Sequence, residues 1–376
     1  MRTIAERIRR SKKSLKKISE ESQIALPRLS EIIESKEPTL TELRRLAVTL
    51  KLELSDFLET NSSPNQTALL FRQTMGNKLK DSHLPAVEVL SHQMEQSLEL
   101  LSNHSCPDWL KPFQVTKHDY PNAQRLAREF RTLFFGDDQF SPIFELPKIA
   151  VERLGVILLV TPNLKIDGAS AIVNGTVFVF ISPRFCPRML FTLAHELGHL
   201  VAHHQTSNNF AFFDAEESTG RFLPEEGTKE RFVDAFASCL LLPSRGIGIT
   251  LKKIRQMFSI EGDNLGDVEL LYLSHIYGVS FQVAAKRCED IGLVPRGSAL
   301  SLYERVCREH GSPEKRAKEL NLSPRPDIEF PKVPTRLLES AAQKIRSGEI
   351  SIGRAAKSLK LTLPTFVEEY SHTLTS

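Results

Sequence analysis

The stretch that most constrains this chain is residues 191–204, an apolar run containing the pattern His-Glu-x-x-His. Residues four apart on a helix lie one turn above each other, so His195 and His199 are expected to project from the same face. Two neutral imidazoles at this spacing can hold one tetrahedral Zn²⁺, leaving places for a third ligand and a water molecule. Glu196 is turned by about 100° from His195. It can therefore reach that water as a general base without binding the metal.

The residues around these three ionisable side chains are almost all apolar. They include Leu193, Ala194, Leu197, Leu200 and Val201. A helix this apolar is expected to be buried, and buried ionisable groups are unfavourable unless something compensates for them. A metal site would compensate for them. The alternative is a core helix whose histidines are satisfied by hydrogen bonds.

Composition describes an ordinary soluble protein of 376 residues, with 25% charged residues and a formal net charge of +3. This length predicts two or three domains. No apolar run reaches the roughly 18 residues that a membrane span needs, so no membrane partner is expected. The five cysteines form no Cys-x-x-Cys pair, which favours buried thiols in a reducing cytoplasm.

Residues 1–60 show apolar residues at helical spacing, with short breaks between the helices. Helices are expected to begin at Ser14, at Leu26–Pro27 and at Thr39, because these residue types favour the first positions of a helix. Four or five short helices, with the second and third arranged as a helix-turn-helix, are typical of a DNA-binding module.

The run 24–54 resembles the repressor-type (XRE) helix-turn-helix family. The resemblance implies that the third helix, about residues 27–34, enters the major groove of DNA. Lys16 or Lys17 stands where the family usually has Gln, and the third helix offers Arg28 and Ser30. These four residues are the candidate DNA contacts.

Charge is distributed unevenly within this module. Residues 1–17 hold eight basic side chains and one acid, whereas residues 18–60 hold five basic and nine acidic side chains. The positive charge therefore lies on the first helix, where it suits phosphate contacts rather than base reading. The alternative is a helical module that docks a protein partner without contacting DNA.

After a polar linker at 61–67, a helical linker region is expected to reach residue 119, and the next domain to span 120–308. In the first part of this domain, the residue pattern predicts helices at 122–135 and 146–154, a buried strand at 155–160, and a turn at Asp167–Gly168. Strands 169–173 and 176–181 are joined by Asn174–Gly175, a strong hairpin signal. A small sheet beside a metal-binding helix is typical of zinc peptidases, in which an edge strand can hold an extended substrate.

The metal still needs a third protein ligand. A histidine six residues after His199 would fall at position 205, which is Gln205. His203 is too far along the helix to share a metal with His195, so it is expected at the surface or the substrate site together with His204. A glutamate from a later helix is the other solution.

Residues 229–242 predict such a helix, with Glu230 and Asp234 one turn apart on one face. In this arrangement Glu230 would bind zinc, and Asp234 would accept a hydrogen bond from the other nitrogen of a ligand histidine. The alternative is a solvated acidic face. Other acids compete as ligands from sequence punctuated by Pro and Gly: Glu217, Glu225 and Glu226.

From Asp167–Gly168 to Pro243, the chain resembles the ImmA/IrrE family of metallo-endopeptidases. The family pattern Arg-x-x-Phe-Thr-x-x-His-Glu-x-x-His matches 188–199. The pattern Glu-x-x-Ala-Asn-x-Phe-Ala-x-x-Leu-Leu-x-Pro matches 230–243, with Val233 for Ala and Asp234 for Asn. The similarity covers roughly residues 120–300. It implies a zincin-like, gluzincin-type fold, bound Zn²⁺ and Glu230 as the third ligand. Members are cytosolic zinc proteases, several cleave or relieve repressors in stress, mobile-element or toxin–antitoxin responses, and many carry a helix-turn-helix.

The remaining segments leave alternatives open. The loop between residues 204 and 230 is rich in phenylalanine and acids, as in a lid or partner surface, or its rings simply pack it down. Two helices are expected within 265–291, and Tyr272, His275 and Tyr277 are the candidate oxyanion donors. Residues 309–334 predict a linker. Residues 335–376 predict a helical tail that resembles the helix-turn-helix of antitoxin-like modules and would bind a partner, dimerise or pack on the core.

The expected architecture is thus multidomain and mainly α, with an N-terminal helix-turn-helix bundle, an α+β peptidase domain with a small sheet, and a small helical C-terminal module. The leading hypothesis is a regulatory zinc endopeptidase that cleaves a DNA-binding repressor or an antitoxin, with Glu196 as its base. The alternative is a transcription regulator or toxin–antitoxin component whose peptidase fold binds or senses without cutting.

Overall fold

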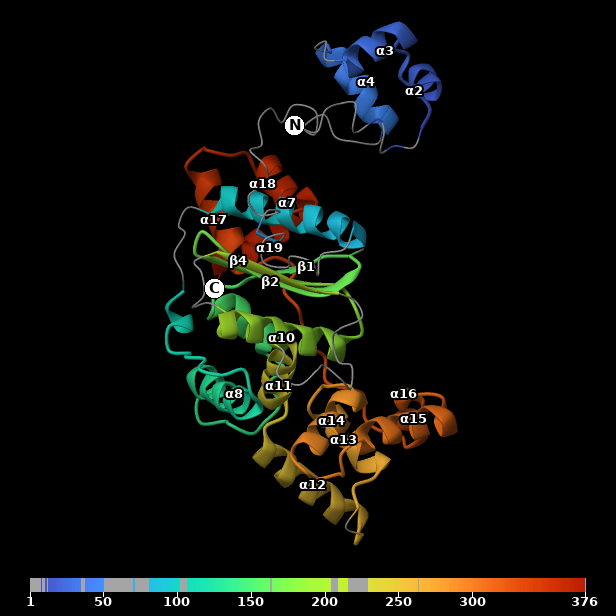
Figure 1. Ribbon diagram of the computed structural model, residues 1–376. Helices are drawn as coiled ribbons and strands as arrows, with labels where there is room; N and C mark the ends of the chain where they lie inside the picture. The colour runs from blue at the N-terminus through green and yellow to red at the C-terminus, as the bar shows by residue number, and fades with distance from the viewer. Residues whose placement is uncertain are drawn as a thin grey trace. The chain divides into compact units, whose positions relative to one another are not determined.

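The computed structural model describes residues 8, 11, 13–34, 38–50, 70–71, 81–101, 107–162, 164–203, 209–215, 229–262 and 264–375. The chain divides into two compact units, Met1–Gln66 and Thr67–Ser376. Across the described residues the protein is mainly helical, with 16 α-helices and one mixed four-stranded sheet (Figure 1).

The first unit contains α2 (Leu15–Ser22), α3 (Leu26–Ile33) and α4 (Leu40–Leu50) around a small core that includes Ile18, Leu29 and Leu46. The three expected helix starts agree with the structure. The Ser14 side chain accepts a hydrogen bond from the backbone N–H of Lys17, and Pro27 lies in the first turn of α3. Thr39 and Glu42 form a reciprocal capping box, which satisfies free N–H groups at the start of α4. The sequence also predicts a final short apolar segment at 52–58 in this module, and it lies outside the described residues.

The sheet of the second unit has the order β1-β3-β2-β4. Its strands are β1 (Ile157–Val160), β2 (Ile166–Val173), β3 (Thr176–Ile181) and β4 (Phe210–Ala215). β1 pairs parallel to β3, and β2 pairs antiparallel to both β3 and β4. The expected hairpin is confirmed, because Val173 pairs with Thr176 across Asn174 (φ 50°) and Gly175 (φ 76°). Two consecutive positive φ angles match the twist of the flanking strands.

Two expectations for this region are wrong. Asp167–Gly168 is not a turn but lies inside β2, where Gly168 pairs with Ile181 on one side and Asp214 on the other. The segment 210–215, expected to be part of a loop, is instead strand β4. Both differences have one cause: pairing with a neighbouring strand overrides the local turn signal and the surrounding polar sequence.

The strands alternate between two apolar layers, as a sheet covered on both faces requires. Val177, Val179 and Ile181 face the layer that contains α10 (Cys186–His203), whereas Phe178 and Phe180 face the opposite layer. That second layer is formed by α7 (Leu84–Leu100), α17 (Thr335–Arg346), α18 (Ile352–Ser358) and α19 (Leu363–Thr375), as Figure 1 shows. The C-terminal tail therefore packs on the sheet, with Phe366 fully buried.

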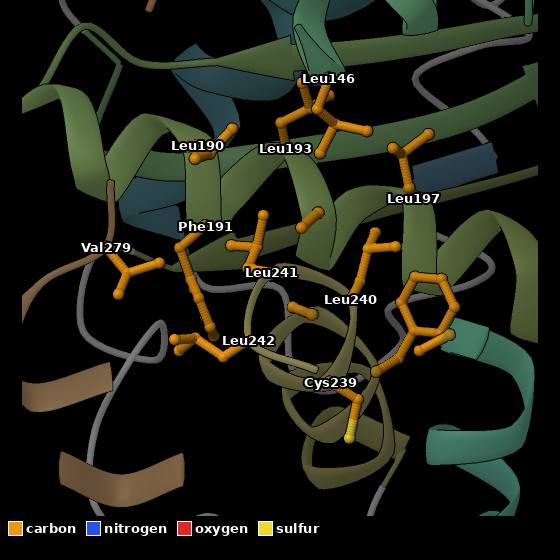
Figure 2. Packing of buried hydrophobic residues seen from close by; sticks show 14 of the residues in the cluster. Leu146, Leu190, Phe191, Leu193, Leu197, Cys239, Leu240, Leu241, Leu242 and Val279 are labelled. Carbon is orange, nitrogen blue, oxygen red and sulfur yellow. The ribbon is translucent and has the colours of Figure 1, made fainter. Parts of the chain in front are cut away.

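The α10 side of the sheet continues into a large helical layer. Figure 2 shows Leu193 of α10 beside Leu146, and Phe191 of the same helix beside Leu242, which follows the end of α11 (Lys229–Leu241). The expected helices at 122–135, 146–154 and within 265–291 are confirmed, and α16 forms inside the expected linker 309–334. The remaining helices are α8 (Tyr120–Phe135), α9 (Leu146–Glu152), α12 (Ser244–Phe258), α13 (Asp267–Ile276), α14 (Phe281–Asp290), α15 (Ser298–His310), α16 (Pro313–Glu319) and the short 3₁₀ turns Asp81–His83 and Asp108–Leu110.

Within the described part of the chain, no single helix is long and apolar enough to cross a membrane. Only α11 and α12 taken together reach that length and composition, and the pair is bent by 50°.

Candidate metal centre

The His-Glu-x-x-His helix is the most deeply buried helix of the second unit. From Leu190 to His203 every side chain of α10 is buried, including His195, Glu196 and His199. The helix is enclosed by the sheet on one side and by α11 on the other, so these ionisable groups are held away from bulk water. Burial of this kind requires compensation by a hydrogen bond or a metal ion.

Three side chains converge at the centre of this helix. Nε2 of His195 lies 3.1 Å from Nε2 of His199, and Oε2 of Glu230 lies 3.6 Å from the first and 3.5 Å from the second. A tetrahedral Zn²⁺ with bonds of about 2.0–2.1 Å places its ligand atoms about 3.3 Å apart. The three atoms therefore have the spacing and the chemistry of a His-His-Glu metal site.

Asp234 fixes the orientation of the first ligand. Its Oδ1 lies 2.8 Å from Nδ1 of His195. Because an ionised carboxylate can only accept, Nδ1 carries the proton and the lone pair of Nε2 points toward His199 and Glu230. Because Glu230 and Asp234 lie one turn apart on α11, one acid faces each ring nitrogen of His195: Glu230 lies near Nε2 and Asp234 near Nδ1.

The Glu196 carboxylate lies against Gly168 of strand β2. A β-carbon placed on Gly168 would lie 2.5 Å from Oε1 of Glu196 and 2.6 Å from Cγ2 of Thr192. Since this distance is too short for any side chain, only glycine at position 168 lets the strand approach the Glu196 carboxylate so closely. Asp167, next in the strand, is buried and pairs with Arg188 at 2.5 Å, which ties the start of α10 to the same strand.

The distance between α10 and α11 is also set by a glycine. A β-carbon on Gly198 would lie 3.0 Å from the ring of Phe236 and 3.2 Å from Cβ of Val233. Gly198 stands next to His199 in the chain, and Val233 stands next to Asp234. The two helices are therefore in close contact at the level of the metal ligands.

The far end of α11 is held by two buried arginines. Arg131 of α8 donates to the carbonyl oxygen of Leu240 at 2.6 Å, and Arg287 of α14 donates to that of Leu242 at 2.9 Å. Both guanidinium groups are almost completely buried. A cation at a helix C-terminus satisfies free carbonyls and interacts favourably with the helix dipole.

Aromatic rings cover the other end of the ligand cluster. The ring of Phe212 on β4 stacks on those of His199 and His203, and His203 stacks in turn on His118. Burial, followed by neighbouring positive charges, lowers the pKa of His203 to about 3, so its ring is neutral at pH 7. Of the two positions expected for His203, the surface is wrong, because the residue is 1% exposed, and the substrate site stays a prediction. His204 and Gln205 lie outside the described residues.

The three candidate oxyanion donors lie in different surroundings from the metal ligands. Tyr277 donates to the carbonyl oxygen of Phe140, Tyr272 packs on Phe258, and Nδ1 of His275 lies 3.1 Å from the carbonyl oxygen of Ser323. These contacts are made with the connection between α8 and α9, with α12 and with the segment after α16, not with the ligand cluster. The competing acids Glu217, Glu225 and Glu226 lie outside the described residues.

The four candidate DNA contacts differ in their exposure and in their hydrogen bonds. Lys16 and Lys17 are exposed on α2, and Ser30 is half-buried on α3. Arg28 is engaged inside its own unit: its Nε donates to Glu42 at 2.9 Å and its Nη1 to Glu31 at 3.2 Å.

Residues 151–289 match the model of the Peptidase M78 family, described as an IrrE N-terminal-like domain. No curated protein matches the chain. The matched range runs from α9 to α14 and includes all four strands, Glu196 and the cluster of His195, His199 and Glu230. This part of the chain is thus a metallopeptidase-like domain with a His-His-Glu group that could hold a metal. The expected resemblance to IrrE is confirmed over these residues, whereas the helix-turn-helix resemblance of residues 24–54 stays a prediction.

Proposed function

We propose that this chain is a zinc-dependent endopeptidase, with His195, His199 and Glu230 as metal ligands and Glu196 as the general base. The observation that carries the proposal is the spacing of 3.1–3.6 Å among the three ligand atoms, on two helices inside a segment that matches a metallopeptidase family. When bound there, Zn²⁺ would polarise the scissile carbonyl and lower the pKa of a water molecule.

The protein side chains divide the remaining work. Glu196 follows the first ligand directly in the sequence and is fully buried. In its role as general base, its carboxylate would accept a proton from water and later pass it to the leaving amine. Asp234 keeps His195 in the tautomer whose Nε2 is free to bind metal. The paired helices α10 and α11 hold these groups rigidly, which limits the reorganisation needed during the reaction.

The sheet supplies a place for the substrate. Among the described strands β4 lies at the end of the sheet beside β2, and it carries Phe212 against the second ligand. An extended peptide that pairs with a sheet edge gains main-chain hydrogen bonds whatever its sequence. We infer that the scissile segment binds in extended form along this edge.

The substrate that fits the chain best is a DNA-binding repressor or an antitoxin in the cytoplasm. The first unit supports this inference, because a helix-turn-helix could bring the peptidase to a repressor or to the DNA on which that repressor sits. Because two glutamates engage Arg28, Lys16 and Lys17 are the exposed basic residues among the four candidate DNA contacts, and they could contact phosphates. A gel shift of the full chain with and without Lys16→Ala/Lys17→Ala tests the DNA contact.

The peptidase proposal is tested with the full-length protein loaded with one equivalent of Zn²⁺. Its probes are a mixed peptide library and any small helix-turn-helix protein encoded beside its gene, with mass spectrometry of the products. Wild type is expected to cut. Glu196→Gln should bind zinc equally but cut at least about 100-fold more slowly, because a general base contributes roughly 10²–10⁴ in rate. Glu152→Gln, an exposed change on α9, is the matched control.

Two outcomes contradict the proposal. Cleavage by Glu196→Gln at the wild-type rate would remove Glu196 from the chemistry. Stoichiometric zinc binding with no cleavage of either probe would favour a regulator that binds or senses through the same fold.

A further inference from the structure

Strand β4 places an aromatic ring directly on a metal ligand. The ring of Phe212 is nearly parallel to that of His199, with an interplanar angle of 9° and centroids 5.2 Å apart. It is also stacked on His203, at 4.6 Å and 22°. Since His199 and His203 stack on each other at 5.6 Å and 26°, the three rings form one packed group. Offset stacking of this kind stabilises the group beyond the burial of its rings.

The two ligand histidines are thus held in different ways. His195 is fixed from α11 by the carboxylate of Asp234. His199 has an aromatic neighbour on each of two elements, His203 one turn later on its own helix and Phe212 on the strand across from it. Rotation of the His199 ring about its Cβ–Cγ bond would swing Nε2 away from Nε2 of His195 and Oε2 of Glu230. The parallel rings of Phe212 and His203 oppose this rotation, because a turned imidazole would lose its stacked contact with both.

We propose that Phe212 is a positioning residue of the metal site, whose ring holds the His199 imidazole in the plane that directs Nε2 toward the other two ligands. This inference rests on the metal site of the proposed function. It adds a residue outside the two motif-bearing helices. It also makes the placement of β4, and not only that of α10 and α11, a condition for strong metal binding.

The same strand provides a matched control. Phe210 is two residues earlier, on the same face of β4, and is buried. Its ring meets His203 edge-on at 6.4 Å and 78°, and meets Phe212 at 5.6 Å and 62°. A change at Phe210 therefore disturbs the packing of β4 without removing the ring that lies on His199.

The test uses the full-length protein with Co²⁺ alone, whose visible absorption reports ligand geometry, and with Zn²⁺ in competition with a chromophoric chelator. Phe212→Leu is expected to weaken metal binding about tenfold, the lower end of the effect of groups that orient metal ligands. It should also shift the Co²⁺ absorption band. Phe212→Tyr keeps the ring and should restore both properties, and Phe210→Leu should leave both as in wild type.

The outcomes separate this inference from the proposed function. If wild type binds neither ion, the metal site itself is refuted. If wild type binds Co²⁺ but Phe212→Leu has the wild-type spectrum and affinity, Phe212 has no positioning role. Equal changes in Phe212→Leu and Phe210→Leu would indicate general loosening of the strand and would also overturn the inference. Should Phe212→Leu fail to fold, Phe212→Met, which is flexible and close in volume, replaces it.

Discussion

His195 donates its Nδ1 proton to the Asp234 carboxylate across 2.8 Å, which joins α10 to α11 at the first ligand. Replacing this acceptor should weaken Zn²⁺ binding by about 10–100-fold, because the ring loses the partner that fixes its tautomer. Asp234→Ala is expected to show the full effect. Asp234→Asn keeps an acceptor without the charge and should fall between Asp234→Ala and wild type. Competition with a chromophoric chelator measures the affinity.

Asp137→Ala serves as the control for this series, since Asp137 is exposed on the turn after α8. An Asp234→Ala protein that bound Zn²⁺ as tightly as wild type would show that the hydrogen bond to His195 is incidental.

Gly168→Ala should impair the reaction more than it impairs the fold. The new methyl group would lie 2.5 Å from Oε1 of Glu196 and 2.6 Å from Thr192, so either the carboxylate or the strand must move. We expect kcat/KM to fall by at least about tenfold, because a general base acts only in the correct position. Zinc stoichiometry should stay at one. Steady-state cleavage of a peptide from the library measures the effect.

Gly248→Ala is the matched control for Gly168→Ala. A β-carbon at Gly248 has no neighbour within 4 Å, and this glycine lies within α12, where alanine is favourable. Unchanged cleavage by Gly168→Ala would mean that Glu196 does not need its observed position.

The metal centre could be predicted largely from sequence because its signals are local. His195, Glu196 and His199 lie on one helix, and Glu230 and Asp234 lie one turn apart on a second helix. What local spacing does not contain is the partner across the fold. Asp167–Gly168 has the composition of a turn, yet Asp167 is paired with Arg188 and Gly168 makes room for Glu196. Neither partner is visible within a few residues of the pair.

Strand β4 was missed for a similar physical reason. Its residues Phe210–Ala215 are surrounded by polar and acidic sequence, and they become a strand by pairing with β2, some forty residues earlier in the chain. The same applies to the covering of the sheet by the C-terminal tail. The tail's helices were predictable from periodicity, but the surface that they cover is formed by Phe178 and Phe180, which are buried on the face of the sheet opposite α10.

Arg131→Met should destabilise the second unit by about 3 kcal/mol. The buried guanidinium donates to the carbonyl oxygens of Gln139, Leu240 and Ser141, and hydrogen bonds from charged donors are worth about 1.5–3 kcal/mol each. Methionine fills part of the volume but leaves these carbonyls without their donor. Urea denaturation followed by circular dichroism measures the change.

Arg128→Met, an exposed change on the same helix, should alter stability by less than about 0.5 kcal/mol. Equal midpoints for Arg131→Met and Arg128→Met would contradict the proposed clamp on α11.

The first unit should lose stability in acid through Glu42. Hydrogen bonds from the Arg28 guanidinium, and then from the backbone N–H of Thr39, lower the pKa of Glu42 from 4.5 to about 2. A carboxylate whose pKa is depressed by folding contributes its stabilisation fully above the unfolded pKa, and loses it as pH falls through the folded value. Glu42→Gln should therefore lower stability at pH 7, and its difference from wild type should shrink between about pH 4.5 and 2.

Hydrogen-exchange protection of the segment 26–50 in the full chain, corrected for intrinsic rates, follows this change. Glu34→Gln is the control, because Glu34 is exposed at the end of α3. A difference between Glu42→Gln and wild type that stayed constant down to pH 2 would exclude the Arg28–Glu42 pair as its cause.

The close contact at Gly198 bears on how the motif itself should be understood. In His-Glu-x-x-His the two unnamed positions carry no metal chemistry, yet at the second of them a single methyl group would meet Phe236 and Val233. To admit it, Phe236 and Val233 of α11, the helix that carries Glu230, would have to give way by a few tenths of an ångström. The position of the third ligand thus depends in part on a residue that would not touch the ion. In this protein the motif therefore constrains the packing of two helices as well as the coordination of a metal.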